Sequence, residues 1–225
     1  MSPETRTERL RQADTWVFDL DNTLYPPSAN LFGQINALMI RFIARALGVD
    51  EAEANRLRLA YWTQFGNTMS GLIAHHGISS EAFLHETHQL DLSGLSPDPA
   101  LRHAIANLPG RRLIHTNGPS AHAERVLAAR GLTDLFAEII AIEDTDLTPK
   151  PQARAYDMFL SRTGIKPART VMVEDHVENL AEPHSREMTT VWLAHGNQMT
   201  TPGYVDYRTE DLTTFLLDCQ RDRQL

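Results

Sequence analysis

The chain has little cysteine and no surplus of positive charge. Cys219 is the only cysteine among 225 residues, so neither a disulfide framework nor a cysteine-rich zinc ribbon can form. The net charge of −8 argues against a nucleic-acid-binding protein, because such proteins need cationic side chains that displace counterions from phosphates. We therefore expect a globular protein that binds no nucleic acid polymer.

Long apolar runs are also missing. No stretch approaches the roughly 18–20 consecutive apolar residues of a membrane span, and residues 1–6 are too polar to begin a signal peptide. We expect a soluble, cytoplasmic protein without a membrane partner.

Five short apolar runs have the composition of strands that are buried on both faces of a parallel sheet. They are residues 15–18, 112–115, 138–142, 170–173 and 190–193. Two helical patterns between the later runs begin near Pro119 and Pro151 and end before Gly131 and Gly164. This alternation predicts an α/β fold with a doubly wound parallel sheet in the order 3-2-1-4-5.

The interval between the first and second runs contains only helical patterns. Gly48 ends the first of them, and Ser80 is placed to cap a third helix. A crossover between two strands does not need so many residues. We therefore expect residues 27–95 to form a small helical domain, inserted into a core of residues 1–26 and 96–225.

A D-x-D-x-T pattern, Asp19-Leu20-Asp21-Asn22-Thr23, follows the first run, and a second match at residues 144–148 follows the third. Strands 1 and 4 are neighbours about 4.8 Å apart, whereas strand 3 lies roughly 14 Å from strand 4. Glu174 and Asp175 end strand 4. Carboxylates after strands 1 and 4 can therefore share one ion at the edge where such sheets bind ligands, and we interpret residues 144–148 as a solvated acidic loop.

This carboxylate cluster is suited to phosphoryl transfer. Asp19, Glu174 and Asp175 offer the hard oxygen ligands that Mg²⁺ prefers, and an aspartate can attack phosphorus to form an aspartyl-phosphate. Mg²⁺ and Lys150 would balance the three negative charges. A fourth charge would then be repelled, so we expect Asp21 to hold a proton and to act as the general acid for the leaving alkoxide.

Two further loops offer contacts for a phosphate group. Lys150, one of only two lysines, stands between two prolines at the start of a helix, where anions are favoured. Thr116 and Asn117 end the second strand before another helix, so a hydroxyl and backbone N–H groups can hold phosphate oxygens there. Taken alone, an exposed loop lysine and an ordinary strand-to-helix turn remain alternatives.

Together these loops resemble those of the haloacid dehalogenase-like superfamily of phosphotransferases. The matching segments each follow a strand, in the family's order, and are residues 19–26, 115–118, 150–151 and 174–180. The resemblance covers nearly the whole chain and implies a Rossmann-like core with an inserted helical type 1 cap.

The resemblance also implies a role for each matched side chain. Asp19 would be the nucleophile and a metal ligand. Asp21 would be the acid/base, with its backbone carbonyl on Mg²⁺. Asp175 would be the acidic metal ligand, and Thr116 and Lys150 would bind the transferring phosphoryl group.

Further segments resemble the pyrimidine 5′-nucleotidase branch of the superfamily; they are residues 25–26, 61–72, 91–92, 97–101 and 188–191. Three positions depart from that branch. His115 stands in place of an aromatic residue and Glu187 in place of a glycine. Pro183 falls inside the helix after Asn179, which we therefore expect to be short or kinked.

The sequence therefore predicts a Mg²⁺-dependent phosphomonoester hydrolase that acts on a nucleoside monophosphate, as a pyrimidine 5′-nucleotidase. Candidate contacts to the nucleoside are Tyr25, Phe65, Asn67 and Met69. Three alternatives stay open. They are a phosphatase of small phosphorylated metabolites such as phosphoglycolate or sugar phosphates, a 2-haloacid dehalogenase, and a non-catalytic regulatory module. The acid at Asp21 disfavours dehalogenation, and the complete set of charged groups disfavours a non-catalytic module.

Overall fold

The structure is a computed structural model that describes residues 3–222, so residues 1–2 and 223–225 lie outside it. The chain divides into two compact units, one formed by Met1–Pro26 with Leu95–Leu225 and the other by Pro27–Gly94. We call these the core unit and the helical unit. Among the described residues, no helix combines the length and the apolar character that a membrane span requires.

The core unit is built on a parallel sheet in the order β3-β2-β1-β4-β5-β6. Its strands are β1 Thr15–Phe18, β2 Arg111–His115, β3 Glu138–Ile140, β4 Thr170–Glu174, β5 Thr189–Leu193 and β6 Tyr207–Thr209. The predicted α/β fold and the order of the first five strands are confirmed. The sequence pattern misses β6 because this edge strand has only three residues, none of them buried, so no apolar run marks it.

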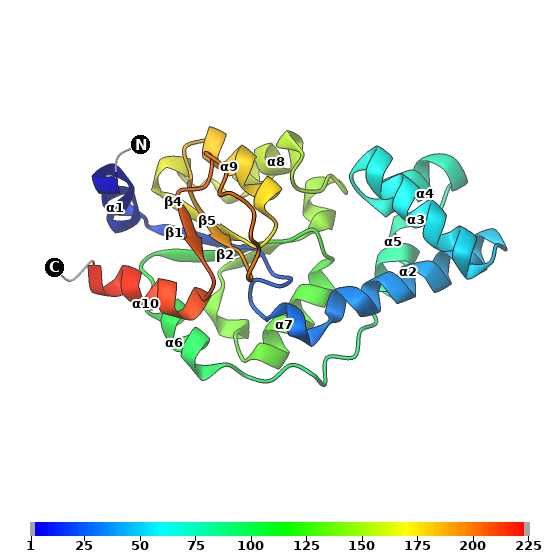
Figure 1. The fold of residues 1–225 in the computed structure, drawn as a ribbon, viewed down its shortest axis with the longest axis horizontal. Coiled ribbons are helices and arrows are strands. Elements are labelled where there is room, and N and C mark those ends of the chain that lie inside the picture. The colour runs from blue at the N-terminus through cyan, green and yellow to red at the C-terminus, as the bar shows by residue number, and fades with distance from the viewer. Residues whose placement is uncertain (1–2, 223–225) are drawn as a thin grey trace. The chain divides into compact units, whose positions relative to one another are not determined.

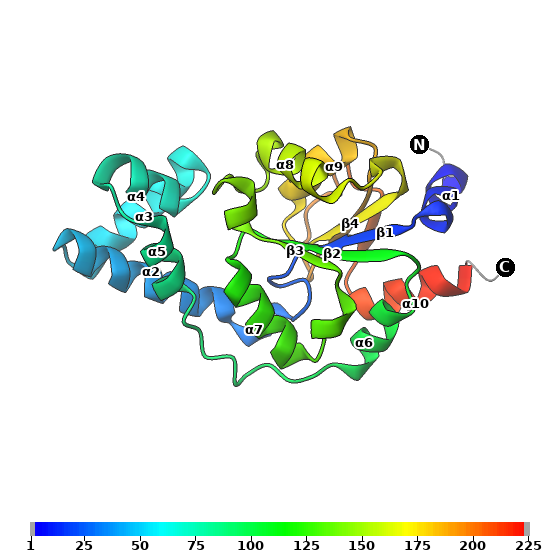
Figure 2. The same cartoon turned by 180° about the vertical axis from the view of Figure 1, so that it is seen from behind.

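Helices cover both faces of this sheet (Figure 1 and, from behind, Figure 2). One face carries α8 (Ala153–Thr163) and α9 (Ala181–Ser185), and the other carries α6 (Pro99–Ala106), α7 (Ser120–Arg130) and α10 (Leu212–Asp222). Helix α1 (Pro3–Gln12) precedes β1, and short 3₁₀ helices span Thr133–Leu135, Ile142–Thr145, Pro167–Arg169 and Val177–Leu180. As predicted, glycines follow the ends of α7 and α8, and both adopt the left-handed conformation.

The central strands are buried along their whole length. Every residue of β1, β4 and β5 is buried, because helices lie on both faces of the sheet. Val17, Met172 and Trp192 belong to one continuous core cluster. The apolar runs therefore mark these strands well, as expected for a parallel sheet.

The connection from β4 to β5 confirms the effect expected of Pro183. A 3₁₀ turn at Val177–Leu180 leads into α9, which has only five residues. Pro183 is the third residue of α9, within the first turn, where a backbone N–H has no partner in the helix. Glu187 follows with a φ of 68°, a left-handed conformation that a glycine would adopt at lower cost.

The helical unit contains α2 Leu31–Leu47, α3 Glu51–Phe65, α4 Thr68–His76 and α5 Ser80–Thr87, after a short 3₁₀ turn at Pro27–Ala29. Gly48 ends α2 as predicted. Two details differ from the prediction: the side chain of Asn67 caps a separate helix, α4, and Ser79 rather than Ser80 caps α5. Helices α3 and α4 approach closely at Gly71, where a Cβ atom would lie 2.3 Å from the Tyr61 ring.

Arg130 binds both segments of the core unit, on either side of the inserted helical unit. Its Nε donates a hydrogen bond to the Leu24 carbonyl (2.9 Å), its Nη1 to the Ser96 carbonyl (2.6 Å) and its Nη2 to the Asp98 carboxylate (2.6 Å). Arg130 is the last residue of α7. The chain therefore leaves and re-enters the core unit at two points that the same buried guanidinium holds.

Candidate active site

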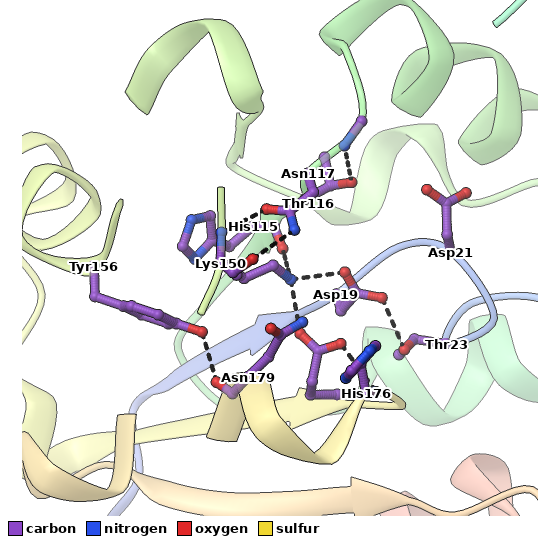
Figure 3. A network of polar contacts seen from close by, with 12 residues as sticks. Asp19, Asp21, Thr23, His115, Thr116, Asn117, Lys150, Tyr156, His176 and Asn179 are labelled. Carbon is purple, nitrogen blue, oxygen red and sulfur yellow. Dashed lines mark hydrogen bonds and ion pairs between the residues drawn. The ribbon is translucent and has the colours of Figure 1, made fainter. Parts of the chain in front are cut away.

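The carboxylates and the lysine that were predicted to form a site lie at the carboxyl edge of the sheet, where β1 and β4 run side by side (Figure 3). The Asp19 N–H donates to the Val173 carbonyl (2.9 Å), which extends the pairing of β1 with β4 one residue beyond Phe18. Asp19 and the pair Glu174-Asp175 therefore leave the sheet at the same level. The adjacency of strands 1 and 4 that was inferred from the sequence is confirmed.

Lys150 lies at the centre of this group, and its side chain is fully buried. Its Nζ donates hydrogen bonds of 2.7 Å to Asp19 Oδ1, Glu174 Oε2 and the His115 carbonyl. Burial opposes the charged form, but the two carboxylates outweigh it and raise the pKa of Lys150 above its ordinary value. All three donors of the ammonium group are therefore used within the protein.

The carboxylates around Lys150 carry more negative charge than one lysine balances. Asp19, Glu174 and Asp175 each place one oxygen within 4.8 Å of the other two. Burial and the charge of Glu174, partly offset by Lys150, raise the pKa of Asp19 to about 7. Burial, with the charge of Asp19, also raises the pKa of Asp175 to about 7. The cluster is therefore short of positive charge.

This donor set fits Mg²⁺, which prefers carboxylate oxygens. Of the two oxygens of Glu174, Oε2 accepts the Lys150 ammonium and Oε1 accepts the His176 N–H at 3.3 Å. Asp19 Oδ2 accepts the Thr23 hydroxyl at 3.1 Å. Asp19, Glu174 and Asp175 are therefore all candidate ligands, and both Asp19 and Glu174 also accept a hydrogen bond from Lys150.

Asn117 and Thr116 shape the loop that follows β2. The Asn117 side chain accepts the Lys150 N–H at its Oδ1 (2.8 Å) and donates from its Nδ2 to the Lys150 carbonyl (3.0 Å). Asn117 thus fixes the backbone that carries Lys150. The Thr116 hydroxyl accepts the Gly118 N–H (3.0 Å), which leaves its own proton to be donated elsewhere.

Asp21 stands apart from the lysine-centred cluster (Figure 3) and has partners of its own. The Tyr25 hydroxyl donates to Asp21 Oδ1 at 2.6 Å, and His122 Nε2 lies 2.8 Å from the same oxygen. Burial and the Asp21 charge raise the pKa of Tyr25 above its ordinary value, so its hydroxyl keeps its proton. Tyr25 is 2% exposed, and its only polar atom is engaged with Asp21 rather than directed to a nucleoside.

The sequence analysis missed His122. It lies in the first turn of α7, the helix that follows β2, and β2 neighbours β1 in the sheet. A histidine in that turn is therefore carried to the loop after β1. This position is the signal that could have identified it.

The remaining candidates for nucleoside contacts belong to the helical unit. Asn67 caps α4, accepting the Ser70 N–H at 2.7 Å, and Met69 is 6% exposed. Phe65 packs edge-on against the rings of Tyr61 and His75. Each has a structural role within that unit.

The second D-x-D-x-T match forms a structural loop, apart from the carboxylate cluster. Asp144 Oδ2 accepts the Ala141 N–H at 3.0 Å and its other oxygen pairs with Arg162 at 3.1 Å. Asp146 makes an exposed ion pair with Arg154 at 3.0 Å. Both aspartates thus pair with arginines of α8, and Asp144 also accepts from the backbone of the loop.

His115 stands below the site as a neutral ring. It stacks on Phe159 with centroids 4.5 Å apart, and burial, with the Lys150 charge, lowers its pKa well below 6.5. Its buried Nδ1 has no hydrogen-bond partner among the residues that the structure describes.

The substitution His115→Phe should therefore raise the free energy of unfolding by about 1–2 kcal/mol, because it keeps the stacking and removes an unsatisfied polar atom. Urea unfolding measures this, and a lower stability of the variant would contradict it.

Comparisons with known proteins agree with this architecture. The description "haloacid dehalogenase-like hydrolase" belongs to the family that matches residues 13–182. Phosphate metabolism protein 8 of Saccharomyces cerevisiae is 27% identical over 190 residues, which are 77% of this chain. The chain spans only 59% of the length of that yeast relative.

Two solved structures share the fold. One is the putative HAD-hydrolase YfnB from Bacillus subtilis bound to magnesium, with a TM-score of 0.58 and 18% identity, covering 95% of this chain and 99% of that chain. The other is a HAD phosphatase from Thermococcus onnurineus, with a TM-score of 0.62 and 20% identity, covering 92% of this chain and 96% of that chain. Since the family match extends over well more than half of the sequence, the chain belongs to the haloacid dehalogenase-like hydrolase family.

Proposed function

We propose that this hydrolase is a Mg²⁺-dependent phosphatase that hydrolyses phosphomonoesters through an aspartyl-phosphate on Asp19. The observation that carries the proposal is the cluster at the ends of β1 and β4, where three carboxylates surround a single buried lysine. Such a cluster lacks positive charge, and a divalent cation supplies it. A phosphate group is then admitted where carboxylates alone would repel it.

Asp19 and Asp175 would hold the Mg²⁺, which shields the negative phosphate from the attacking carboxylate when it is bound. Asp19 forms a bond to phosphorus as the bond between phosphorus and the leaving oxygen breaks. The Thr116 hydroxyl donates to a phosphate oxygen, and Lys150 holds Asp19 in its orientation. Asn117 keeps Lys150 in place through the two backbone hydrogen bonds described above.

Asp21 is the proton donor and acceptor in this proposal. It gives its proton to the leaving oxygen in the first half of the reaction. In the second half it takes a proton from the water that attacks phosphorus, as the bond between phosphorus and Asp19 breaks. Phosphate is released, and both aspartates return to their starting states.

We further propose that the helical unit is a cap that selects the leaving group, and that the substrates are nucleoside monophosphates, with a preference for pyrimidines. Two points support this: the resemblance of residues 61–72 to the pyrimidine 5′-nucleotidase branch, and the aromatic side chains of Tyr61 and Phe65 in that stretch. Phe65, Asn67 and Met69 remain the proposed contacts.

A turnover panel tests the proposed function. The purified full chain is assayed with p-nitrophenyl phosphate, pyrimidine and purine nucleoside 5′-monophosphates, phosphoglycolate and sugar phosphates, each with MgCl₂ and with EDTA. We expect phosphate release that EDTA abolishes, with the highest kcat/KM for pyrimidine nucleotides. A preference for sugar phosphates or phosphoglycolate would overturn the substrate but keep the chemistry. Chloride release from 2-chloropropionate that survives EDTA, or no turnover of any ester, would overturn the chemistry.

A further inference from the structure

The imidazole of His195 reaches the loop that follows β1. His195 lies just beyond β5, and its Nε2 is 2.5 Å from the carbonyl oxygen of Asn22. A carbonyl oxygen can only accept, so Nε2 carries the hydrogen and donates it. In the sheet β4 lies between β1 and β5. The contact therefore joins two loops whose strands are not neighbours.

The turn that presents His195 contains two residues in the left-handed conformation. His195 has a φ of 46° and Gly196 a φ of 76°. The Asn197 N–H donates to the Ala194 carbonyl at 2.8 Å and closes a β-turn around them, and the Glu210 carboxylate accepts the Gly196 N–H. Positive φ values are uncommon for residues other than glycine and occur most often at functional sites. The turn therefore suggests a role for the imidazole that it presents.

Asn22 connects His195 with the carboxylate cluster. It also has a positive φ, 58°, which asparagine tolerates better than most residues. Its side chain hydrogen-bonds to the Asp175 carboxylate and so opposes the burial that raises the pKa of Asp175. The carbonyl of Asn22 is thus held by His195 while its side chain holds Asp175.

The end of β5 also holds Asp175 directly. The indole Nε1 of Trp192, a residue of β5, donates to the Asp175 carbonyl at 2.9 Å. Trp192 is part of the buried core, whereas His195 is exposed. Of these two side chains, His195 is therefore the one that can be replaced without disturbing the core.

We propose that His195 is a positioning residue for the metal site, which acts through Asn22 on the carboxylate of Asp175. The hydrogen bond to the Asn22 carbonyl fixes the peptide from which the Asn22 side chain extends, so the amide stays against Asp175. A carboxylate that is already oriented loses less conformational freedom when it binds a metal ion. The proposal rests on the proposed function, in which Asp175 is a ligand of Mg²⁺, and it adds a histidine from a third loop.

The test measures Mg²⁺ binding without substrate as well as turnover. The full chain is unfolded with urea at a series of MgCl₂ concentrations and constant ionic strength. The gain in the free energy of unfolding gives the dissociation constant of Mg²⁺. The same MgCl₂ series with p-nitrophenyl phosphate gives the concentration that half-activates turnover and the value of kcat at saturating Mg²⁺.

Three substitutions of His195 separate the hydrogen bond from the shape of the turn. His195→Ala removes the donor, and His195→Gly removes it while adopting the positive φ without strain. We expect both to raise the dissociation constant of Mg²⁺ by about 10-fold, the lower end of the effect of groups that support a metal ligand, with kcat at saturating Mg²⁺ within about 2-fold. His195→Gln should recover part of the loss, because its amide can donate to the Asn22 carbonyl.

A double substitution tests whether His195 acts through Asn22. Asn22→Gly keeps the carbonyl and the left-handed conformation but removes the side-chain amide, so it should also weaken Mg²⁺ binding. Adding His195→Gly to Asn22→Gly should change little, since residues that act in one chain of contacts are not additive. The control His103→Ala, which removes an exposed imidazole from α6, should match the wild type.

An unchanged dissociation constant of Mg²⁺ in His195→Gly would overturn the proposal, because only the shape of the turn would then matter. A His195→Gln variant that binds Mg²⁺ no better than His195→Ala would also overturn it. So would losses in His195→Gly and Asn22→Gly that add in full, since the histidine would then not act through Asn22. A wild-type protein whose stability and turnover do not respond to Mg²⁺ would instead refute the proposed function itself.

Discussion

The substitution Asp19→Asn should lower turnover of p-nitrophenyl phosphate by at least about 10⁴-fold in the presence of Mg²⁺. An amide cannot form the acyl-phosphate bond, and loss of a covalent nucleophile typically removes most of an enzyme's rate enhancement. The uncatalysed hydrolysis of phosphate monoesters is among the slowest reactions known, so little background rate can mask the effect. Steady-state kinetics with a coloured product measures it directly.

The same variant should fold at least as stably as the wild type in EDTA. Asp19 is 6% exposed, and burial raises its pKa to about 7, so the ionised carboxylate is disfavoured in the folded protein at neutral pH. An amide removes that cost while its oxygen can still accept from Lys150. The matched control is Asp146→Asn in the second D-x-D-x-T loop, an exposed position whose φ of 49° suits asparagine. Near-normal activity in Asp19→Asn, with a normal Asp146→Asn control, would rule out the aspartyl-phosphate.

The substitution Lys150→Met should have the second largest effect, and it should affect both stability and activity. Removing the ammonium group leaves Asp19 and Glu174 buried without their cation, which costs about 3–5 kcal/mol for a buried pair that loses one partner. Turnover should fall by about 10²–10³-fold, because the nucleophile loses its fixed orientation and the site its permanent positive charge. Urea unfolding in EDTA near pH 8 and steady-state kinetics with Mg²⁺ measure the two effects.

Two comparisons make this prediction specific. Lys166→Met, at the only other lysine and an exposed position, should be close to neutral. Glu174→Gln introduced into Lys150→Met should recover part of the lost stability, because it removes one of the stranded charges. The loss should also be smaller near pH 5.5. There Asp19 and Asp175, whose pKa values burial raises to about 7, are largely protonated and need no cation. If the loss of stability changed neither with pH nor with the added Glu174→Gln substitution, an electrostatic role of Lys150 would be contradicted.

The strands that carry the site were predictable because a strand that is buried on both faces has a continuous apolar sequence. The run Thr15–Phe18 coincides with β1 as observed, and the motif that follows it needs no tertiary information. Strand β6 and helix α1 were not predicted, because neither has a continuous apolar run. The inserted segment contains four α-helices where three were expected, because the sequence analysis did not expect the helix α4, which Asn67 caps.

The carboxylate cluster could be predicted because sheet order alone brings the end of β1 next to the end of β4. The place of Lys150 in this cluster could also be predicted, because a lysine side chain is long enough to reach the carboxylates from its own loop. The surroundings of Asp21 could be predicted only in part. The place of His122 in the first turn of α7 brings it near the loop after β1, but His122 lies 101 residues from Asp21 in the sequence, and spacing does not show which face of α7 turns towards that loop. Tyr25 was identified for its ring, whereas its hydroxyl makes the contact that matters to Asp21.

Arg130 gives the interruption of the core unit a further meaning. Its guanidinium donates hydrogen bonds to the Leu24 carbonyl before the inserted segment, and to the Ser96 carbonyl and the Asp98 carboxylate after it. Both ends of the inserted segment are therefore held by the same side chain. We expect that a segment of another length or sequence can replace the inserted one without disturbing the end of β1. If the helical unit is the proposed cap, replacing residues 27–94 with a foreign segment should therefore change the preferred leaving group, while the carboxylates at the ends of β1 and β4 stay in place.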